Sequence, residues 1–429
     1  MEKTCIELTS TFVALFTKVR RPKSEVVHSR NDGIIFGMKI LVVVGARPNF
    51  MKAAPILKAI REFNGMRGHW AGAIQPILVH TGQHYDAKMS DAFFADLEMP
   101  APDVFLGAGS GSHAEQTAEI MKRFEPVLLR ERPDVILVVG DVNSTLACAL
   151  VASKMPSNAH PAIAHIEAGL RSFDRNMPEE INRILTDQLS DFLFVTEESG
   201  VRNLRKEGIP ASKVHLVGNT MIDSLREYEA RAEASPIMRT LGVEKRAYAL
   251  LTLHRAANVD ERDTLVEILQ GISELSKLVT VVFPAHPRTQ KKICELGLSR
   301  YVADSMRIVE PLGYLDFLCL MKHARLVVTD SGGIQEETTA LGVPCVTARE
   351  NTERPVTIDV GTNLLGGTRR DTIAKAIRIQ LASKSRATLP DLWDGRAAAR
   401  IVGILADRYM RAEAMAAHAA SGQIVQNAR

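Results

Sequence analysis

Acidic and basic side chains crowd into one stretch, HIEAGLRSFDRNMPEEINR (165–183), directly after the apolar run PAIA. Glu167 ends an apolar strand pattern, so its carboxylate must find a partner or a solvated cavity. Glu179 and Glu180 follow a proline at a predicted helix start, where the helix dipole alone would stabilise them. Arg183, four residues after Glu179, could pair with it on one helical face. The stretch is either a solvated surface loop or a pocket where carboxylates move protons on a bound substrate.

A second candidate site is the segment TDSGGIQEETTALG (329–342), which predicts a strand, a glycine pair and a helix in succession. Ser331, Gly332 and Gly333 would place free backbone N–H groups and a helix N-terminus at a strand tip, which suits a diphosphate. Glu337, about one turn inside the helix, could accept hydrogen bonds from ribose hydroxyls. The alternative is a simple turn whose serine caps the helix.

Further ionisable residues follow other predicted strands. Arg47 and Lys52, in GARPNFMKAAPI, could neutralise phosphate, because a cation at a helix N-terminus is unfavourable unless an anion also binds there. Asp141 follows ILVVG, where capping of the next helix is an equally good explanation. His254 and His286 also stand at strand ends, and a lone histidine there is more often structural than catalytic.

These residues need elements to position them, and the chain from Met38 on alternates apolar runs with helical stretches. The runs are apolar throughout, which is typical of strands buried on both faces of a parallel sheet. The predicted strands are 39–45, 76–82, 134–141, 162–167, 192–196, 248–254, 279–286, 325–333 and 344–348. Ligands bind outside the carboxyl ends of such strands, so the strand-end charges predict a cleft between two domains.

We therefore predict an α/β protein with two Rossmann-like doubly wound domains and a cleft between them. The expected parts are an extension over 1–37 (either disordered or a misassigned start, without the order of a secretory signal), domains over 38–217 and 218–393, and a tail over 394–429 whose helix returns to the first domain.

Composition excludes several classes of protein. The chain has 429 residues, 46% hydrophobic and 24% charged, with a net charge of +3, which gives no reason to expect a nucleic acid or a membrane surface as partner. Five scattered cysteines without a CxxC pair favour a reducing cytoplasm. No metal-ligand spacing and no apolar run long enough to span a membrane are present, so we expect neither a metal nor a transmembrane helix.

From Met38 to about residue 409, the sequence resembles the non-hydrolysing UDP-N-acetylglucosamine 2-epimerases. The matching segments are GARPNFMKAAPI, TGQHYDAKMS, GSHAEQTA, PDVILVVGDVNSTLA, HIEAGLRSFDRNMPEEINRILTDQLSD, VGNTMID, TLHRAANVD, HPRTQ, TDSGGIQEE and NTERPVTIDVGTN. The resemblance implies the glycosyltransferase-B arrangement, a homodimer and reversible conversion of UDP-GlcNAc and UDP-ManNAc for surface polysaccharide synthesis. Its route expels UDP to leave 2-acetamidoglucal and needs no cofactor.

The resemblance also implies roles for individual residues. It assigns Asp141, Glu167 and Glu179 as acid/base carboxylates and places His254 near the phosphates. Carboxylates so crowded should raise one another's pKa. The implied substrate-binding and UDP-binding residues are Arg47, Lys52, Arg183, His286, Ser331, Gly332, Gly333 and Glu337. Gln83 and His84, in TGQHYD, match a segment that binds a second UDP-GlcNAc as activator in bacterial members, although His84 could equally pack at a strand end.

Four rival functions remain open on the same scaffold. One is a 2-epimerase for UDP-2,3-diacetamido-glucuronate, although the segment NTERPVT favours the UDP-GlcNAc enzyme. The others are a hydrolysing 2-epimerase that releases free ManNAc, a non-catalytic sugar-nucleotide sensor and a glycosyltransferase. In HRAANVD the residue at Ala257 is often Glu in the family, so a contact from that side chain is in doubt.

Overall fold

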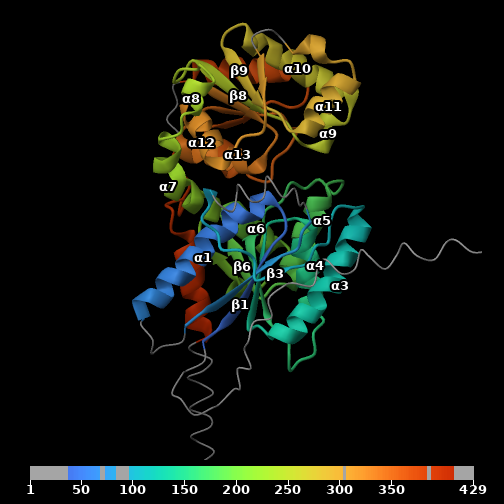
Figure 1. Cartoon of the computed structure of the whole chain (residues 1–429), viewed down its shortest axis with the longest axis vertical. Coiled ribbons are helices and arrows are strands. Elements are labelled where there is room, and N and C mark those ends of the chain that lie inside the picture. The colour runs from blue at the N-terminus through green and yellow to red at the C-terminus, as the bar shows by residue number, and fades with distance from the viewer. Residues whose placement is uncertain (1–36, 68–72, 84–95, 303–305, 384–387, 410–429) are drawn as a thin grey trace, which may run out of the picture. The chain divides into compact units, whose positions relative to one another are not determined.

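The computed structural model describes residues 37–67, 73–83, 96–302, 306–383 and 388–409 (Figure 1). Except for Gly37, the predicted N-terminal extension lies outside these residues, as does the end of the predicted tail.

The first half of the chain builds a sheet of seven parallel strands in the order β3-β2-β1-β4-β5-β6-β7. The strands are β1 (Lys39–Val44), β2 (Gln75–His80), β3 (Val104–Phe105), β4 (Val135–Val139), β5 (Ala162–Ala168), β6 (Phe192–Val195) and β7 (Val214–Leu216). Their connections contain α1 (Arg47–Arg67), α3 (His113–Glu131), α4 (Asn143–Ala152), α5 (Pro178–Leu189), α6 (Glu198–Lys206) and the 3₁₀ turn η2 (Ala211–Lys213).

The second half builds a sheet of six parallel strands in the order β10-β9-β8-β11-β12-β13. The strands are β8 (Tyr248–Thr252), β9 (Thr280–Pro284), β10 (Met306–Val309), β11 (Leu326–Thr329), β12 (Cys345–Thr347) and β13 (Asn363–Leu365). The helices are α7 (Thr220–Glu233) and α8 (Ile237–Thr240) before this sheet, then α9 (Ala256–Val259), α10 (Arg262–Ser276), α11 (Pro287–Glu295), η3 (Ser299–Tyr301), α12 (Tyr314–His323), α13 (Gly332–Leu341), α14 (Val356–Asp359) and α15 (Arg370–Ala382).

Helices cover both faces of each sheet, and this explains why the central strands are apolar throughout (Figure 1). In β1, Ile40, Val42 and Val44 face one hydrophobic cluster, while Leu41 and Val43 face another that includes residues of α3 and α4. Strand order and helix placement confirm the predicted α/β fold with two doubly wound sheets.

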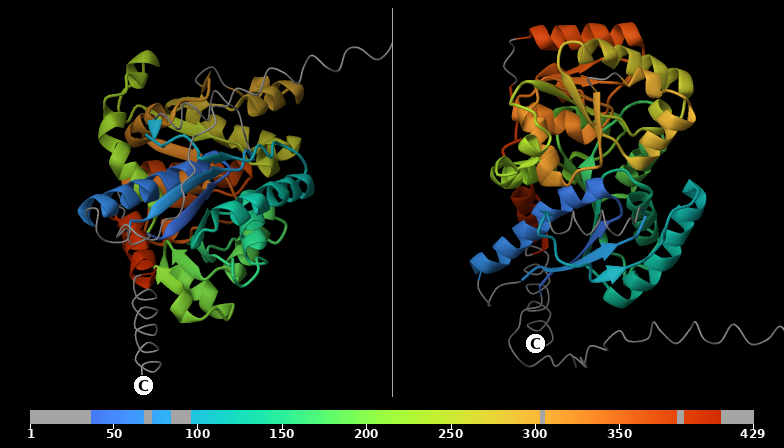
Figure 2. Two further views of the ribbon diagram at one scale, coloured as in Figure 1. Left: turned by 60° about the horizontal axis from the view of Figure 1, so that its bottom comes forward. Right: turned by 45° about the horizontal axis from the view of Figure 1, so that its top comes forward.

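A last described helix, over 397–409, follows the second sheet but packs against the first half of the chain (Figure 2). The carboxylate of Asp223 accepts hydrogen bonds from the backbone N–H groups of Ala397 (3.1 Å) and Ala398 (2.7 Å), which caps the helix N-terminus. Trp393, just before it, donates from Nε1 to the carbonyl of Thr196 at 3.0 Å. The predicted domain limits stay predictions. Among the described residues, no helix is long and apolar enough to cross a membrane.

Candidate active site

Three ionisable residues predicted at strand ends, and a fourth that the structure adds, lie at corresponding places in the two sheets. Asp141 follows β4, Glu167 is the penultimate residue of β5, and His254 follows β8, while Asp330 is the added residue and follows β11. Since neighbouring parallel strands end at one edge, each pair is held on adjacent strands: β4 pairs with β5, and β8 with β11.

Glu167 sits in a bulge at the end of β5. The pairing of β5 with β6 shifts between Ile166 and Ala168, and Glu167 has a φ of 71°, which is costly for a residue with a side chain. Its side chain is 3% exposed, and Oε2 lies 2.5 Å from the Lys52 ammonium. Oε1 is buried without a hydrogen-bond partner among the described residues. The bulge therefore aims one paired and one unpaired carboxylate oxygen into the site.

Asp141 is bound by Arg183, whose guanidinium also contacts Glu180 at 2.6 Å. Burial alone would raise the pKa of Asp141, but the positive charges of Arg183 and Lys52 outweigh it and hold the pKa below its usual value. The expectation that crowded carboxylates raise one another's pKa is therefore wrong for Asp141, because the structure interleaves cations with them. The expected contact of Arg183 with Glu179 is replaced by the pair with Glu180, since Arg183 turns into the interior.

The two glutamates of the PEE segment have different environments. Glu180 is buried and accepts hydrogen bonds from the backbone N–H groups of Ser172 and Phe173, both at 2.9 Å, which fixes the loop before α5. Glu179, on the same turn, is half-buried, and its side chain has no hydrogen bond or ion pair with another described residue. Its carboxylate is thus available to a ligand, whereas that of Glu180 is not.

The turn that carries Asp141 is fixed by buried polar groups. His165 Nε2 lies 2.8 Å from the carbonyl of Gly140, and Asn182 donates from Nδ2 to the carbonyl of Asp141 at 2.8 Å. His165 is in turn held by Asp187 at 2.7 Å. This scaffold positions Asp141 without using its carboxylate.

His254 and Asp330 form a histidine–carboxylate pair across the ends of β8 and β11. His254 Nδ1 lies 2.8 Å from Asp330 Oδ1, while the imidazole side chain remains 56% exposed, so Nε2 is accessible. Desolvation by the surrounding protein would lower the pKa of His254, but the charge of Asp330 outweighs it and raises the pKa above its ordinary value. Asp330 also accepts from the backbone N–H groups of His254 and Arg255. The pair can hold an imidazolium at the site.

The glycine pair after β11 opens α13 as predicted, and Ser331 stands at the N-cap position of this helix but makes no side-chain capping bond. A Cβ at Gly332 would lie 2.5 Å from Arg354 Nη1, and one at Gly333 would lie 3.0 Å from Met221 Cε, so the absence of side chains admits close neighbours. Glu337 is 5% exposed and accepts from the Tyr314 hydroxyl at 3.1 Å. Burial raises the pKa of Glu337 to about 8.

The remaining predicted residues are only partly described. Arg47 begins α1, but its side chain lies outside the described part of the structure, as does all of His84. Gln83 is buried and accepts from the backbone and hydroxyl of Ser144. His286 caps α11 by accepting from Arg288 N at 3.2 Å, which is a structural contact.

Sequence reasoning missed a group of charged residues after β12 that complete the site. Arg354 Nη1 lies 2.6 Å from Glu353 Oε1, and its Nη2 lies 3.7 Å from Glu167 Oε2. Arg349 pairs with the second oxygen of Glu353 at 2.7 Å. The sequence feature that could have revealed them is the run RENTERP (349–355), which is dense in charged residues. Part of this run belongs to a segment that carries the family resemblance. Residues of both sheets therefore meet in one buried ionic cluster.

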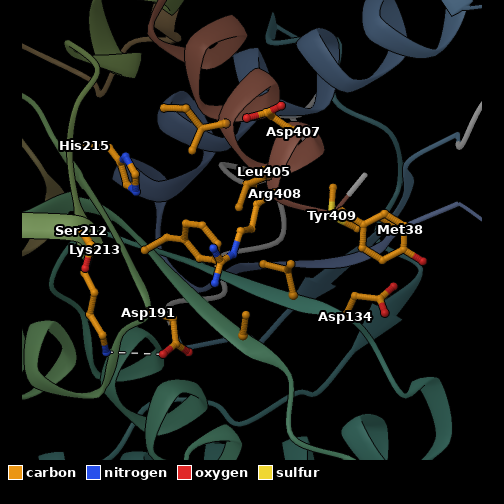
Figure 3. Close-up of a pocket in the computed structure, with 14 residues that line it drawn as sticks. Met38, Asp134, Asp191, Ser212, Lys213, His215, Leu405, Asp407, Arg408 and Tyr409 are labelled. Atoms are coloured by element: carbon orange, nitrogen blue, oxygen red, sulfur yellow. Dashed lines mark hydrogen bonds and ion pairs between the residues drawn. The ribbon is translucent and has the colours of Figure 1, made fainter. Parts of the chain in front are cut away.

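A cavity of about 790 Å³ lies elsewhere, at the amino ends of the strands of the first sheet (Figure 3). It is lined by Met38, Asp134, Ala162 and Phe192, at the starts of β1, β4, β5 and β6, together with residues of the last helix. Because ligands of parallel sheets bind at the carboxyl ends, we place the active site at the ionic cluster and not in this cavity.

Two doubly wound sheets with a charged site at their strand ends define an α/β enzyme of the glycosyltransferase-B type. The family model for UDP-N-acetylglucosamine 2-epimerase matches residues 69–406. The chain is 44% identical over 375 residues to the UDP-N-acetylglucosamine 2-epimerase of Methanocaldococcus jannaschii, covering 86% of this chain and 99% of that one. It belongs to the UDP-N-acetylglucosamine 2-epimerase family, which confirms the resemblance.

Two further comparisons add detail. The chain is 43% identical over 373 residues to the UDP-2,3-diacetamido-2,3-dideoxy-D-glucuronate 2-epimerase of Pseudomonas aeruginosa, covering 86% of this chain and 99% of that one. The crystal structure of the Methanocaldococcus jannaschii UDP-GlcNAc 2-epimerase in complex with UDP-GlcNAc and UDP superimposes with a TM-score of 0.79 at 43% identity, covering 86% of this chain and 99% of that one. The protein is therefore an isomerase of the 2-epimerase class.

Proposed function

We propose that the protein interconverts UDP-GlcNAc and UDP-ManNAc by inverting carbon C2 of the hexose. The observation that carries the proposal is the buried carboxylate of Glu167, which has one oxygen on Lys52 and the other without a partner among the described residues. A desolvated, unsatisfied carboxylate oxygen is rare in folded proteins and suits a group that exchanges protons with a ligand.

The chemistry explains why the reaction needs both carboxylates and cations. The C2 hydrogen lies next to an acetal carbon, so a carbanion there has no carbonyl to stabilise it. If the C1–O bond breaks first, UDP leaves with the electron pair, and positive charge at C1 acidifies the C2 proton. A carboxylate takes that proton, and 2-acetamidoglucal results. UDP then adds back at C1 while a proton arrives at C2 on the opposite face.

The residues divide these tasks by charge. Asp141 is ionised at neutral pH because Arg183 and Lys52 lower its pKa, so it stabilises positive charge developing at C1. Glu167 and Glu179 have carboxylate oxygens free for proton transfer. His254, whose pKa the charge of Asp330 raises, and the backbone N–H groups after β11 bind the departing diphosphate. Arg47, Lys52 and Glu337 stay predicted UDP-binding residues.

The test is incubation of the protein with UDP-GlcNAc in deuterated water, followed by NMR of the recovered sugar nucleotides. We expect UDP-ManNAc to form and deuterium to appear at C2 of both epimers, because the removed proton exchanges with solvent. Product without deuterium would contradict the proton-transfer route, and free ManNAc would identify the hydrolysing alternative.

The similarity to the Pseudomonas aeruginosa enzyme favours UDP-2,3-diacetamido-glucuronate as a second candidate substrate. The same assay with both sugar nucleotides decides between them by their kcat/KM values, since discrimination is a difference in transition-state binding. We expect the higher value for UDP-GlcNAc.

Other features of this proposal follow from the resemblance alone. They are a homodimer, a cytoplasmic location, supply of polysaccharide synthesis, and activation by a second UDP-GlcNAc bound near Gln83 and His84.

A further inference from the structure

A buried carboxylate without a role in the proposed reaction lies beside the cations of the site. Glu336, on α13, is 0% exposed, and its Oε1 lies 2.7 Å from Arg354 Nε. Neither carboxylate oxygen has hydrogen-bond geometry with another described residue. Burying an ionisable group with so little compensation is costly, and a glutamine or an apolar side chain at this position would avoid the cost.

The guanidinium of Arg354 is shared unequally among three carboxylates. Its Nη1 lies 2.6 Å from Glu353 and its Nε lies 2.7 Å from Glu336, whereas its Nη2 stays 3.7 Å from Oε2 of Glu167. The last distance exceeds that of a hydrogen bond. Arg354 thus makes its two short contacts with Glu353 and Glu336, and its contact with Glu167 is the longest of the three.

This separation matters because a direct arginine contact favours the charged form of a carboxylate and reduces its affinity for a proton. Glu167 already has one cation, Lys52, on Oε2. A second cation at hydrogen-bond distance would make Glu167 a weaker base at the step that takes the C2 proton.

We propose that Glu336 is a positioning residue that holds Arg354 back from Glu167 and so preserves the basicity of Glu167. The inference rests on the proposed epimerisation and assigns Glu336 no contact with substrate. It predicts that the charge of Glu336, and not merely its bulk, is needed for turnover.

The charged groups that face Glu336 set the pH at which Glu336 is ionised and can hold Arg354. Burial raises the pKa of Glu336, and the negative charge of Glu167 raises it further. Arg354 and Lys52 lower it, and the resulting pKa is about 7. Glu337, on the same helix, also lies close enough to interact. Glu336 gains its charge as the pH rises through neutrality, so turnover should rise over the same range.

The test is the pH profile of kcat and KM for the full chain with Glu336→Gln, which keeps the shape and removes the charge. We expect kcat to fall about tenfold, because the base at Glu167 would bind its proton about ten times more weakly. KM should change little. The rise of kcat with pH near neutrality should be lost. Glu119→Gln, an exposed carboxylate on α3 paired with Lys122 and Arg123, is the matched control and should keep the wild-type profile.

A folded Glu336→Gln variant with wild-type kcat and an unchanged limb would overturn the proposal. If that variant does not fold, Glu336→Asp decides, because it keeps the charge but withdraws it from Arg354. Its kcat should fall by less than about tenfold with the limb retained, and a wild-type kcat would overturn the proposal.

If the wild-type protein epimerises neither sugar nucleotide, the proposed function fails first. The placement of Arg354 is then judged without substrate, from crystal structures of the wild-type protein and of Glu336→Gln. In the variant, Nη2 of Arg354 should move to hydrogen-bond distance from Oε2 of Glu167. A separation that stays near the 3.7 Å of the wild-type protein would overturn the inference.

Discussion

Each carboxylate of the site has its own set of neighbours, and these neighbours decide what the carboxylate can do. Glu353 lies among Arg354, Arg349 and Arg255, which outweigh its burial and hold its pKa well below the usual range. Glu180 is saturated by backbone donors and Arg183. Among the described carboxylates of the PEE segment and of the end of β5, only those of Glu167 and Glu179 have an oxygen without a hydrogen-bond partner.

The sequence predicted those residues whose placement is local. Glu167 and Asp141 directly follow strands, so the direction of a parallel sheet is enough to bring them to one edge. Arg354 and Glu353 come from a segment after β12, and their approach to β5 depends on how distant parts of the chain pack. The spacing of residues in the sequence does not predict that approach. It also does not predict whether Arg183 pairs with Glu179 or with Glu180.

Asp330→Asn tests the histidine pair at the residue level. Without the carboxylate charge, the pKa of His254 should fall toward its ordinary value, because Asp330 is what raises it. A protonated His254 is lost as the pH rises through that pKa. The falling limb of kcat/KM should therefore move to lower pH, and a limb that moves by about one pH unit lowers the activity above neutrality about tenfold. Asp263→Asn, on an exposed side chain of α10, is the control, and an unmoved limb in Asp330→Asn would contradict the role of the pair.

At the level of elements, the strands that the sequence missed have one property in common. The strands β3, β7, β10 and β13 are the outermost strands of the two sheets. Each is short and partly exposed, as in β7, where no residue is buried. An apolar run predicts a strand only where helices cover both of its faces, so the pattern reveals the central strands and not the edges.

The last helix depends on a cap from a distant element. Asp223→Ala removes the acceptor that Asp223, on α7, offers to the N–H groups of Ala397 and Ala398. We expect the free energy of unfolding to fall by about 1–2 kcal/mol, the usual cost of losing an N-cap. Chemical denaturation measures the change, with Asp263→Ala, whose side chain is 98% exposed, as the matched control. Equal stability of the two variants would show that the cap contributes nothing.

At the level of the whole molecule, the site requires residues from both sheets. Arg354 approaches Glu167, and Arg255 Nη1 lies 3.8 Å from the sulfur of Met177 on the loop before α5. One hydrophobic cluster also contains residues of both sheets, including Ile40 and Leu250. Neither half contains the complete set of groups that elimination and re-addition of UDP would need.

A crystal structure of the protein with UDP-GlcNAc bound would test the proposed mechanism without relying on kinetics. We predict that the diphosphate lies at the glycine pair of α13 and near His254. We also predict that carbon C2 of the hexose lies about 3–3.5 Å from a carboxylate oxygen of Glu167 or Glu179, the separation of reacting atoms poised for transfer. A hexose bound away from Asp141, Glu167 and Glu179, for example in the cavity beneath the last helix, would contradict the mechanism.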